Sequence, residues 1–183
     1  MKKLYPILIV AFIVLVGVFY VLVEKHPPVI TDYKNAEYVI DGTRIKLTEG
    51  ISEVVATPGS ASKIVTKYFG NEIFKDLNDD GREDVVFLLT QETGGSGVFF
   101  YAVAALNTPG GYVGSESIFL GDRIAPQTTE SGKYKIVIVN YADRASGEDF
   151  SVQPSVGKSI WLLLDPETMQ FGEVAQNFEG ESR

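Results

Sequence analysis

Residues 76–84 read DLNDDGRED, and the apolar run VVFLL follows at once at residues 85–89. Side chains that carry oxygen stand at the first, third, fifth and ninth positions of the first run, and Gly81 stands at the sixth. Calcium-binding loops place carboxylate and amide oxygens at alternating positions of this kind, with a glycine where the loop turns sharply. The stretch therefore predicts a cation-binding loop that leads directly into a buried strand.

The predicted calcium ligands are the side chains of Asp76, Asn78, Asp80 and Asp84 and the backbone carbonyl of Arg82. The loop is not an EF-hand, because Phe87 stands at the twelfth position, where a bidentate Glu belongs. Carboxylates gathered in one loop repel one another without a cation, which is a physical reason to expect one. A metal-free turn, held by its own Asx hydrogen bonds and by water, is the alternative.

Composition excludes several classes of chemistry. The 183-residue chain contains no cysteine, so disulfides, thiolate nucleophiles and cysteine-based metal sites are excluded. Its single histidine, His26, lies beside the first apolar segment, which leaves no Ser-His-Asp triad for the globular part. The net charge of −8 argues against a nucleic-acid partner, because phosphate binding needs a basic face. Residues 94–97 (GGSG) are not followed by Lys-Ser or Lys-Thr, so no nucleotide partner is expected either.

Residues 4–23 form an uncharged apolar segment of 20 residues, preceded by Lys2 and Lys3. A helix of about 20 residues spans the hydrocarbon core of a bilayer, and lysines at one end favour the cytoplasmic side. The sequence that follows lacks the small-residue pattern of a cleavage site. We therefore predict a retained single-pass anchor in the cell membrane, with the rest of the chain outside the cytoplasm. A signal peptide cleaved at an unusual site is the alternative.

The predicted organisation has four parts. They are a cytoplasmic tip and transmembrane anchor (residues 1–23), a juxtamembrane linker (24–36), an extracytoplasmic β domain (37–178) and a polar tail (179–183). The linker carries Pro27 and Pro28, and a proline-containing polar segment suits an extended spacer that lifts a domain off the membrane.

Short apolar runs joined by turns predict an all-β domain. Residues 38–47 read as a hairpin around the Asp41-Gly42 turn, and residues 51–56 as a further strand. Residues 60–69 fit either a helix capped by Ser60 or an edge strand, and the strand is slightly favoured because of their β-branched content. The runs at 85–89, 98–106, 136–139 and 160–164 are apolar on both faces, which indicates strands covered on both sides. Short connections predict mostly antiparallel neighbours, in a sandwich or a partly closed barrel behind the transmembrane helix.

The acidic run followed by apolar residues resembles the calcium loops of FG-GAP and VCBS repeats. Proteins of those families contain the motif several times, whereas this chain contains it once. A wider pattern resembles a group of bacterial exported or membrane-anchored β domains. It consists of YFG at 68–70, the acidic loop, GGSGVFFY at 94–101, AALN at 104–107, FLGDRI at 119–124 and NYADR at 140–144. The resemblance implies a fold and a location but no activity.

Two short motifs place an aspartate beside an arginine next to an apolar strand. These are Asp122 with Arg123, and Asp143 with Arg144. One interpretation is a shared cleft that holds a polar ligand; the other is a pair of salt-bridged strand ends.

These patterns together predict a membrane-anchored structural or binding module, with the membrane and a protein or polar ligand as its partners. The alternative is an extracytoplasmic hydrolase. It would use either paired carboxylates or Ser96 activated by Lys133, Lys135 or Lys158.

Overall fold

β-strands form almost all the regular structure in the computed structural model of the chain, which describes residues 29–59 and 61–175. The elements are η1 (a 3-10 helix, Tyr33–Asn35), β1 (Glu37–Ile40), β2 (Thr43–Lys46), β3 (Ile51–Val55), β4 (Lys63–Lys75), β5 (Asp84–Glu92), β6 (Phe99–Thr108), β7 (Gly111–Gly114), β8 (Ile118–Asp122), β9 (Ala125–Ser131), β10 (Val137–Asp143), β11 (Val156–Asp165) and β12 (Gln170–Glu173). This confirms the prediction of an all-β domain.

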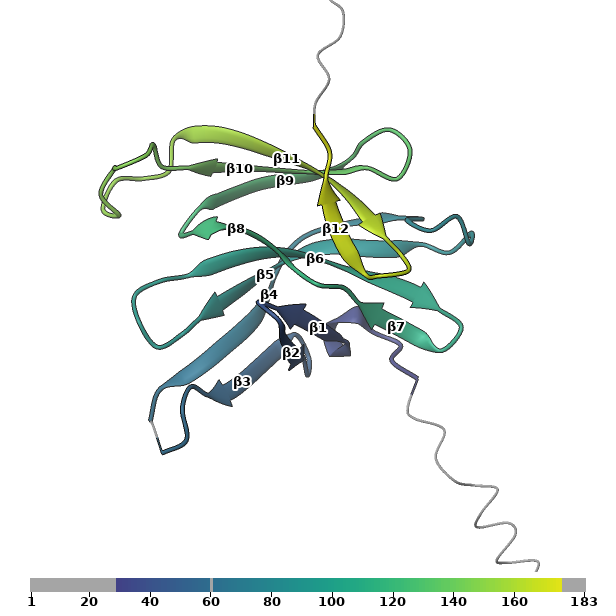
Figure 1. Cartoon of the computed structure of the whole chain (residues 1–183), viewed down its shortest axis with the longest axis horizontal. Coiled ribbons are helices and arrows are strands. Elements are labelled where there is room, and N and C mark those ends of the chain that lie inside the picture. Colours follow the sequence, from purple (N-terminus) through teal and green to yellow (C-terminus); the bar gives the residue numbers. More distant parts are fainter. Residues whose placement is uncertain (1–28, 60, 176–183) are drawn as a thin grey trace, which may run out of the picture.

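The strands form three layers. A six-stranded sheet has the order β3-β4-β5-β6-β7, with β8 also paired to β6, and a four-stranded sheet has the order β12-β11-β10-β9. The strands pair in antiparallel fashion throughout, and β1 and β2 form a separate hairpin. The four-stranded sheet covers one face of the six-stranded sheet and the hairpin covers the other (Figure 1). The molecule is thus an open layered sandwich and not a closed barrel.

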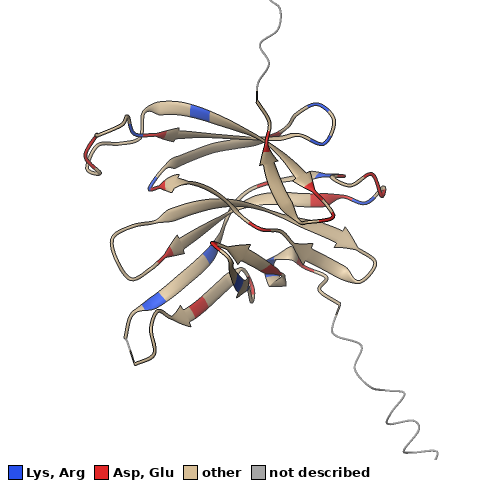
Figure 2. Ribbon diagram, viewed as in Figure 1, with Lys and Arg blue, Asp and Glu red and all other residues tan. Residues whose placement is uncertain are grey.

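Strands β5 and β6 lie in the middle layer. Seven of the nine residues of β5 are buried, and its charged residues stand only at its two ends (Figure 2). Side chains alternate along a strand, so Phe87 points to the hairpin and Leu88 to the four-stranded sheet. The sequence prediction that these apolar runs are covered on both sides is confirmed.

An aromatic cluster joins the hairpin to the middle layer. The Tyr38 ring on β1 is fully buried and meets Phe87 edge to face, with ring centroids 5.5 Å apart. Its hydroxyl donates to the Tyr33 carbonyl at 2.7 Å, and the Tyr33 ring lies 5.2 Å from that of Phe87. Because edge-to-face rings and a satisfied hydroxyl fix the geometry, the hairpin has one defined position on the sheet.

The opposite face of the middle layer packs against the four-stranded sheet. Leu88 of β5 and Ala102 of β6 lie against Val139 of β10 and Leu162 of β11. Along one side of the two sheets, the Lys75 amine at the end of β4 donates to three oxygens of the turn after β9. These are Ser131 Oγ at 3.0 Å, the Gly132 carbonyl at 2.9 Å and the Ile136 carbonyl at 3.2 Å. This lysine therefore holds the turn of one sheet against the edge of the other.

The hairpin and the segment before the acidic loop both form strands. The predicted hairpin at 38–47 is confirmed, with positive φ at Asp41 and Gly42, as a type I′ turn requires. The segment 60–69 is a strand from Lys63 onward, which confirms the strand over the helix; Ser60 lies outside the described residues. The prediction of an edge strand was wrong, because β3 pairs with this segment on one side and β5 on the other.

The predicted linker, residues 24–36, needs correction at its end. Ile30 pairs with Gly111 beside β7, and Tyr33 and Ala36 pack into the core beneath β5. These apolar side chains bury surface that a free spacer would expose, so the domain begins before residue 37. The predicted anchor at 4–23 lies outside the described residues. Within 29–59 and 61–175, no helix is long and apolar enough to cross a membrane.

Gly114 on β7 offers a test of the packing between hairpin and sheet. A Cβ atom there would lie 2.2 Å from the Glu37 carbonyl oxygen and 2.7 Å from the Tyr38 ring. We expect Gly114→Ala to displace the hairpin and destabilise the protein by about 1–3 kcal/mol, a fall of several degrees in melting temperature. Gly95→Ala, where a Cβ would meet no atom within 4 Å, is the matched control and should melt like the parent. Equal melting of both variants would contradict this packing.

Candidate functional site

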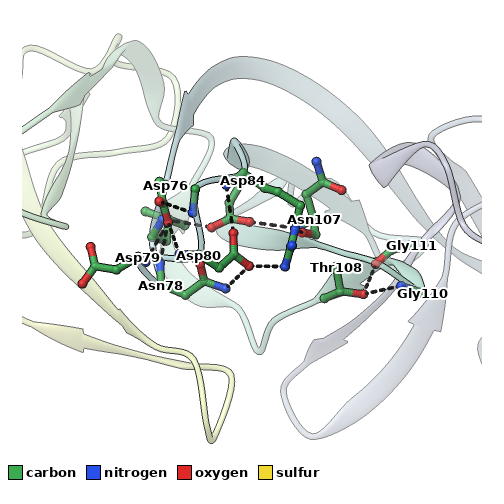
Figure 3. Close-up of polar contacts among 12 residues, drawn as sticks. Asp76, Asn78, Asp79, Asp80, Asp84, Asn107, Thr108, Gly110 and Gly111 are labelled. Carbon is green, nitrogen blue, oxygen red and sulfur yellow. Dashed lines mark hydrogen bonds and ion pairs between the residues drawn. The ribbon is translucent and has the colours of Figure 1, made fainter.

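The acidic loop connects β4 to β5, and its carboxylates accept hydrogen bonds from its own backbone (Figure 3). Asp76 Oδ1 accepts from the backbone N–H of Asp79 at 2.7 Å, with longer bonds from Asn78 and Asp80, and Oδ2 accepts from that of Gly81 at 2.8 Å. The N–H of Gly81, with smaller contributions from the other three, lowers the pKa of Asp76. Asp76 thus organises the loop as an Asx turn does.

Asp84 ends the loop and is fully buried. Its two carboxylate oxygens accept from two backbone N–H groups, that of Leu77 at 2.9 Å and that of Asn107 on β6 at 2.8 Å. Burial raises the pKa of Asp84, and the charges of Asp80 and Asp76 add to that rise, while the two N–H bonds oppose it. Asp84 therefore connects the loop to the end of the neighbouring strand.

Arg82 makes a second connection between the same elements. Its guanidinium pairs with Asp80, and its Nε donates to the Asn107 carbonyl. Asp80 also accepts from the Asn78 side chain at 2.9 Å. Farther out, Lys135 pairs with the exposed Asp79. The loop is thereby fastened to β6 through both polar backbone groups of Asn107.

The predicted calcium ligands lie close together in the chain, but their oxygens do not converge on one point. Asp76 and Asp84 face backbone N–H groups, and Asp80 faces Arg82. Within the described ranges, no group of three or more His, Cys, Asp or Glu side chains is arranged to hold a metal. As it stands, this arrangement does not fit a calcium ion, which would need Asp80 to leave Arg82. Calcium binding at these residues stays a prediction, and it requires that rearrangement of Asp80.

The two Asp-Arg motifs do come together in space. Arg144 donates from Nη1 to the Arg123 carbonyl at 2.9 Å, so the two strand ends touch. Arg123 pairs with Asp122 at 2.7 Å, and Lys158 pairs with Asp143 at 2.6 Å. These cations lower the pKa values of the two aspartates.

The same arginines hold the loop between β10 and β11. Arg144 Nε donates to the Val152 carbonyl at 2.6 Å, and the Arg123 guanidinium lies 3.8 Å from the centroid of the Phe150 ring. Because each of the four predicted cleft residues already has a partner within the protein, the contacts favour salt-bridged strand ends over a ligand cleft at Asp122, Arg123, Asp143 and Arg144.

A different concavity lies at the edge of the hairpin. The β1–β2 hairpin has strands of four residues, whereas β5 and β6 have nine and ten, so the hairpin leaves part of the sheet uncovered. The uncovered part is a groove of about 440 Å³. We call it the aromatic groove. It is lined by Asp41, Gln91, Thr93, Phe99, Tyr101 and Phe119. Small-ligand sites usually occupy about 300–1,000 Å³ and combine aromatic walls with a few polar groups.

Strand pairing sets the positions of the groove residues. Phe99 and Tyr101 are two residues apart on β6 and share one face, where Gln91 pairs with Phe99 and Phe119 pairs with Tyr101. The Phe119 ring lies 5.4 Å from that of Tyr101 and remains 54% exposed. The Asp41 carboxylate, at the hairpin turn, accepts from the Tyr101 hydroxyl at 3.0 Å. The hairpin thus brings a carboxylate to the edge of an aromatic surface.

Sequence reasoning did not find this groove. In the sequence, Asp41 belongs to the predicted turn, Phe99 and Tyr101 belong to the apolar run at 98–106, and Phe119 begins the FLGDRI pattern at 119–124. The one available signal was the concentration of aromatic residues in the run VFFY at 98–101, which the strand pattern also explains.

The Ser-Lys alternative finds no support in the contacts. Ser96 is exposed, and no hydrogen bond joins it to a lysine within the part of the chain that the structure describes. Lys135 pairs with Asp79, and Lys158 pairs with Asp143.

No known protein family, curated protein or solved structure matched the chain. The resemblance to FG-GAP and VCBS loops, and to exported bacterial β domains, therefore rests on the residues quoted above.

Thermal melting tests calcium binding to the acidic loop. We expect chelator to lower the melting temperature by several degrees relative to calcium-containing buffer, since a cation bound only by the folded state contributes about 2.7 kcal/mol at a hundredfold excess over Kd. Asp80→Ala should remove that difference, whereas Asp149→Ala, in a different exposed loop, should retain it. If the parent melts at the same temperature in calcium and in chelator, the prediction of calcium binding is wrong. Arg82 and the backbone N–H groups then stabilise the loop without a metal.

Proposed function

We propose that the chain is a membrane-anchored extracytoplasmic binding module and that the aromatic groove is its ligand-binding surface. The observation that carries the proposal is the exposed Phe119 ring, which stands beside Tyr101 and Asp41 in a groove of ligand size. Aromatic and polar side chains that converge on one concavity are typical of binding sites.

The middle layer supports the groove as a rigid base. Tyr101 is nearly fully buried, and its neighbours on the same face, Leu89 and Phe87, belong to the aromatic core beneath the hairpin. Phe99 packs over Gly97, where an added Cβ would lie 2.8 Å from the ring. A groove built on packed strands binds with little loss of conformational entropy, because its walls are already ordered.

The competing proposal is a hydrolase that uses paired carboxylates or a Ser-Lys pair. In the 76–84 loop, Asp76 and Asp84 accept from backbone N–H groups and Asp80 pairs with Arg82. The contacts therefore favour the binding module.

Chemical-shift mapping tests the groove. The full chain in an uncharged polyoxyethylene detergent is screened against a mixed library of cationic, neutral and anionic fragments. We expect the fragments that bind to shift the backbone amides of Thr93, Phe99, Tyr101 and Phe119. Phe119→Ala should abolish the shifts, whereas Phe150→Ala, whose ring is equally exposed at 54%, should leave them unchanged. A library that shifts no groove amide would refute the proposed function.

The anchor belongs to the same proposal and is tested separately. Because residues 4–23 are apolar and no cleavage pattern follows them, mass spectrometry of the membrane fraction should find peptides that include residues before Glu24. Protease added outside intact cells should cleave the β domain. A soluble mature protein that begins near residue 24 would contradict retention of the anchor.

A further inference from the structure

We propose that the aromatic groove takes a protonated organic amine, with the ammonium group at Asp41 and its apolar substituent on the rings of Tyr101, Phe99 and Phe119. This inference rests on the proposed binding function and specifies the class of ligand.

The charge of the groove is negative. Asp41 is the charged residue among the six that line it, and no lysine or arginine takes part. Within the described residues, no ion pair neutralises Asp41, whereas Asp122 and Asp143 each have a cationic partner. The chain as a whole has a formal net charge of −8. An anionic ligand would therefore meet repulsion, and a cation would be attracted.

The hydrogen-bonding groups of the groove point to the same class. The Tyr101 hydroxyl already donates to Asp41, and the Gln91 amide donates to Thr66 Oγ1 at 3.1 Å. Burial, followed by the hydrogen bond to Asp41, raises the pKa of Tyr101 to about 12, so the hydroxyl keeps its proton at neutral pH. The groove thus has few donors left, and it offers the carboxylate oxygens of Asp41 as acceptors. A ligand that donates, as an ammonium does, complements these acceptors.

The aromatic walls suit a cation and its apolar substituent. The Phe119 ring is tilted by 55° to that of Tyr101 and by 49° to that of Phe99, with centroids 5.4 Å and 6.3 Å away. All three rings line the groove, and a cation over the face of a ring and within about 6 Å of its centroid is attracted by the ring. The domain itself makes such contacts, because Lys34 Nζ lies 4.1 Å from the centroid of the Tyr68 ring.

A neutral sugar is the nearest competitor, because sugars also stack on aromatic rings. Sugar hydroxyls accept as well as donate, and they need donors that the groove has largely committed elsewhere. The volume of about 440 Å³ exceeds that of a bare ammonium group, so the amine carries an apolar substituent that fills the groove.

Three probes that share a benzyl or phenyl ring and differ in charge test the ligand class. Benzylammonium, benzyl alcohol and benzoate are titrated into the full chain in the same uncharged detergent, with empty micelles as the correction for partitioning. We expect benzylammonium to shift the groove amides saturably, benzyl alcohol to bind about tenfold more weakly, and benzoate not to bind. Two further compounds are titrated in the same way. n-Butylammonium tests whether the amine can be a lysine-like side chain, and maltose represents neutral sugars.

Two variants assign the effect to the named residues. Asp41→Asn keeps an acceptor for Tyr101 and tolerates the positive φ of 48° at the turn, so it removes the charge alone. It should reduce benzylammonium affinity about tenfold and leave benzyl alcohol unchanged. Phe119→Leu should weaken the binding of benzylammonium, because it removes one of the aromatic rings. The matched controls, Asp149→Asn and Phe150→Leu, should behave like the parent.

The outcomes separate the ligand class from the binding function. If benzyl alcohol, benzoate or maltose shifts the groove amides at least as strongly as benzylammonium, the amine assignment is wrong and the groove remains a binding site. The same holds if other fragments bind there and no amine does. If no fragment shifts these amides, both proposals fail. Binding of n-butylammonium as tight as that of benzylammonium supports the amine class and points to a lysine side chain as its source.

Discussion

Burial of both faces of β5 and β6 is the constraint on which the rest of the structure depends. These strands carry apolar side chains on each face, and a strand of this kind is stable only when two further layers cover it. The four-stranded sheet provides one cover through Val139 and Leu162, and the hairpin with η1 provides the other through Tyr38 and Tyr33. The three-layer arrangement is therefore a direct consequence of two apolar runs in the middle of the chain.

The hairpin is shorter than the strands it covers, and the two ends of β5 differ in what closes them. At its beginning, Asp84 and Arg82 bond to both backbone groups of Asn107, so the exposed end of the sheet is closed by polar contacts. At its other end the short hairpin stops at Asp41, and the aromatic groove remains open. The proposed binding surface thus lies where the cover is missing.

The charged motifs prominent in the sequence have mostly structural contacts. Asp76 orders its own loop, and Arg123 and Arg144 hold the loop that carries Phe150. Such groups gain more from fixed partners within the protein than they would from water, since backbone donors and carbonyls lie at hydrogen-bond distance. Asp41, by contrast, faces a groove with aromatic walls and has a neutral hydroxyl as its partner.

The sequence by itself determined the central strands and the hairpin, because strand formation is encoded largely in neighbouring residues. The apolar runs at 85–89 and 98–106 and the Asp41-Gly42 turn predicted β5, β6 and the hairpin, and the β-branched content of residues 60–69 slightly favoured a strand over a helix. Only the tertiary structure decided which residues meet. Asp41 and Tyr101 are 60 positions apart, and Phe119 reaches Tyr101 through a pairing that contains a bulge. Local alternation sets which face a side chain takes, but the register and order of distant strands depend on how whole layers pack. The groove exists because of that packing.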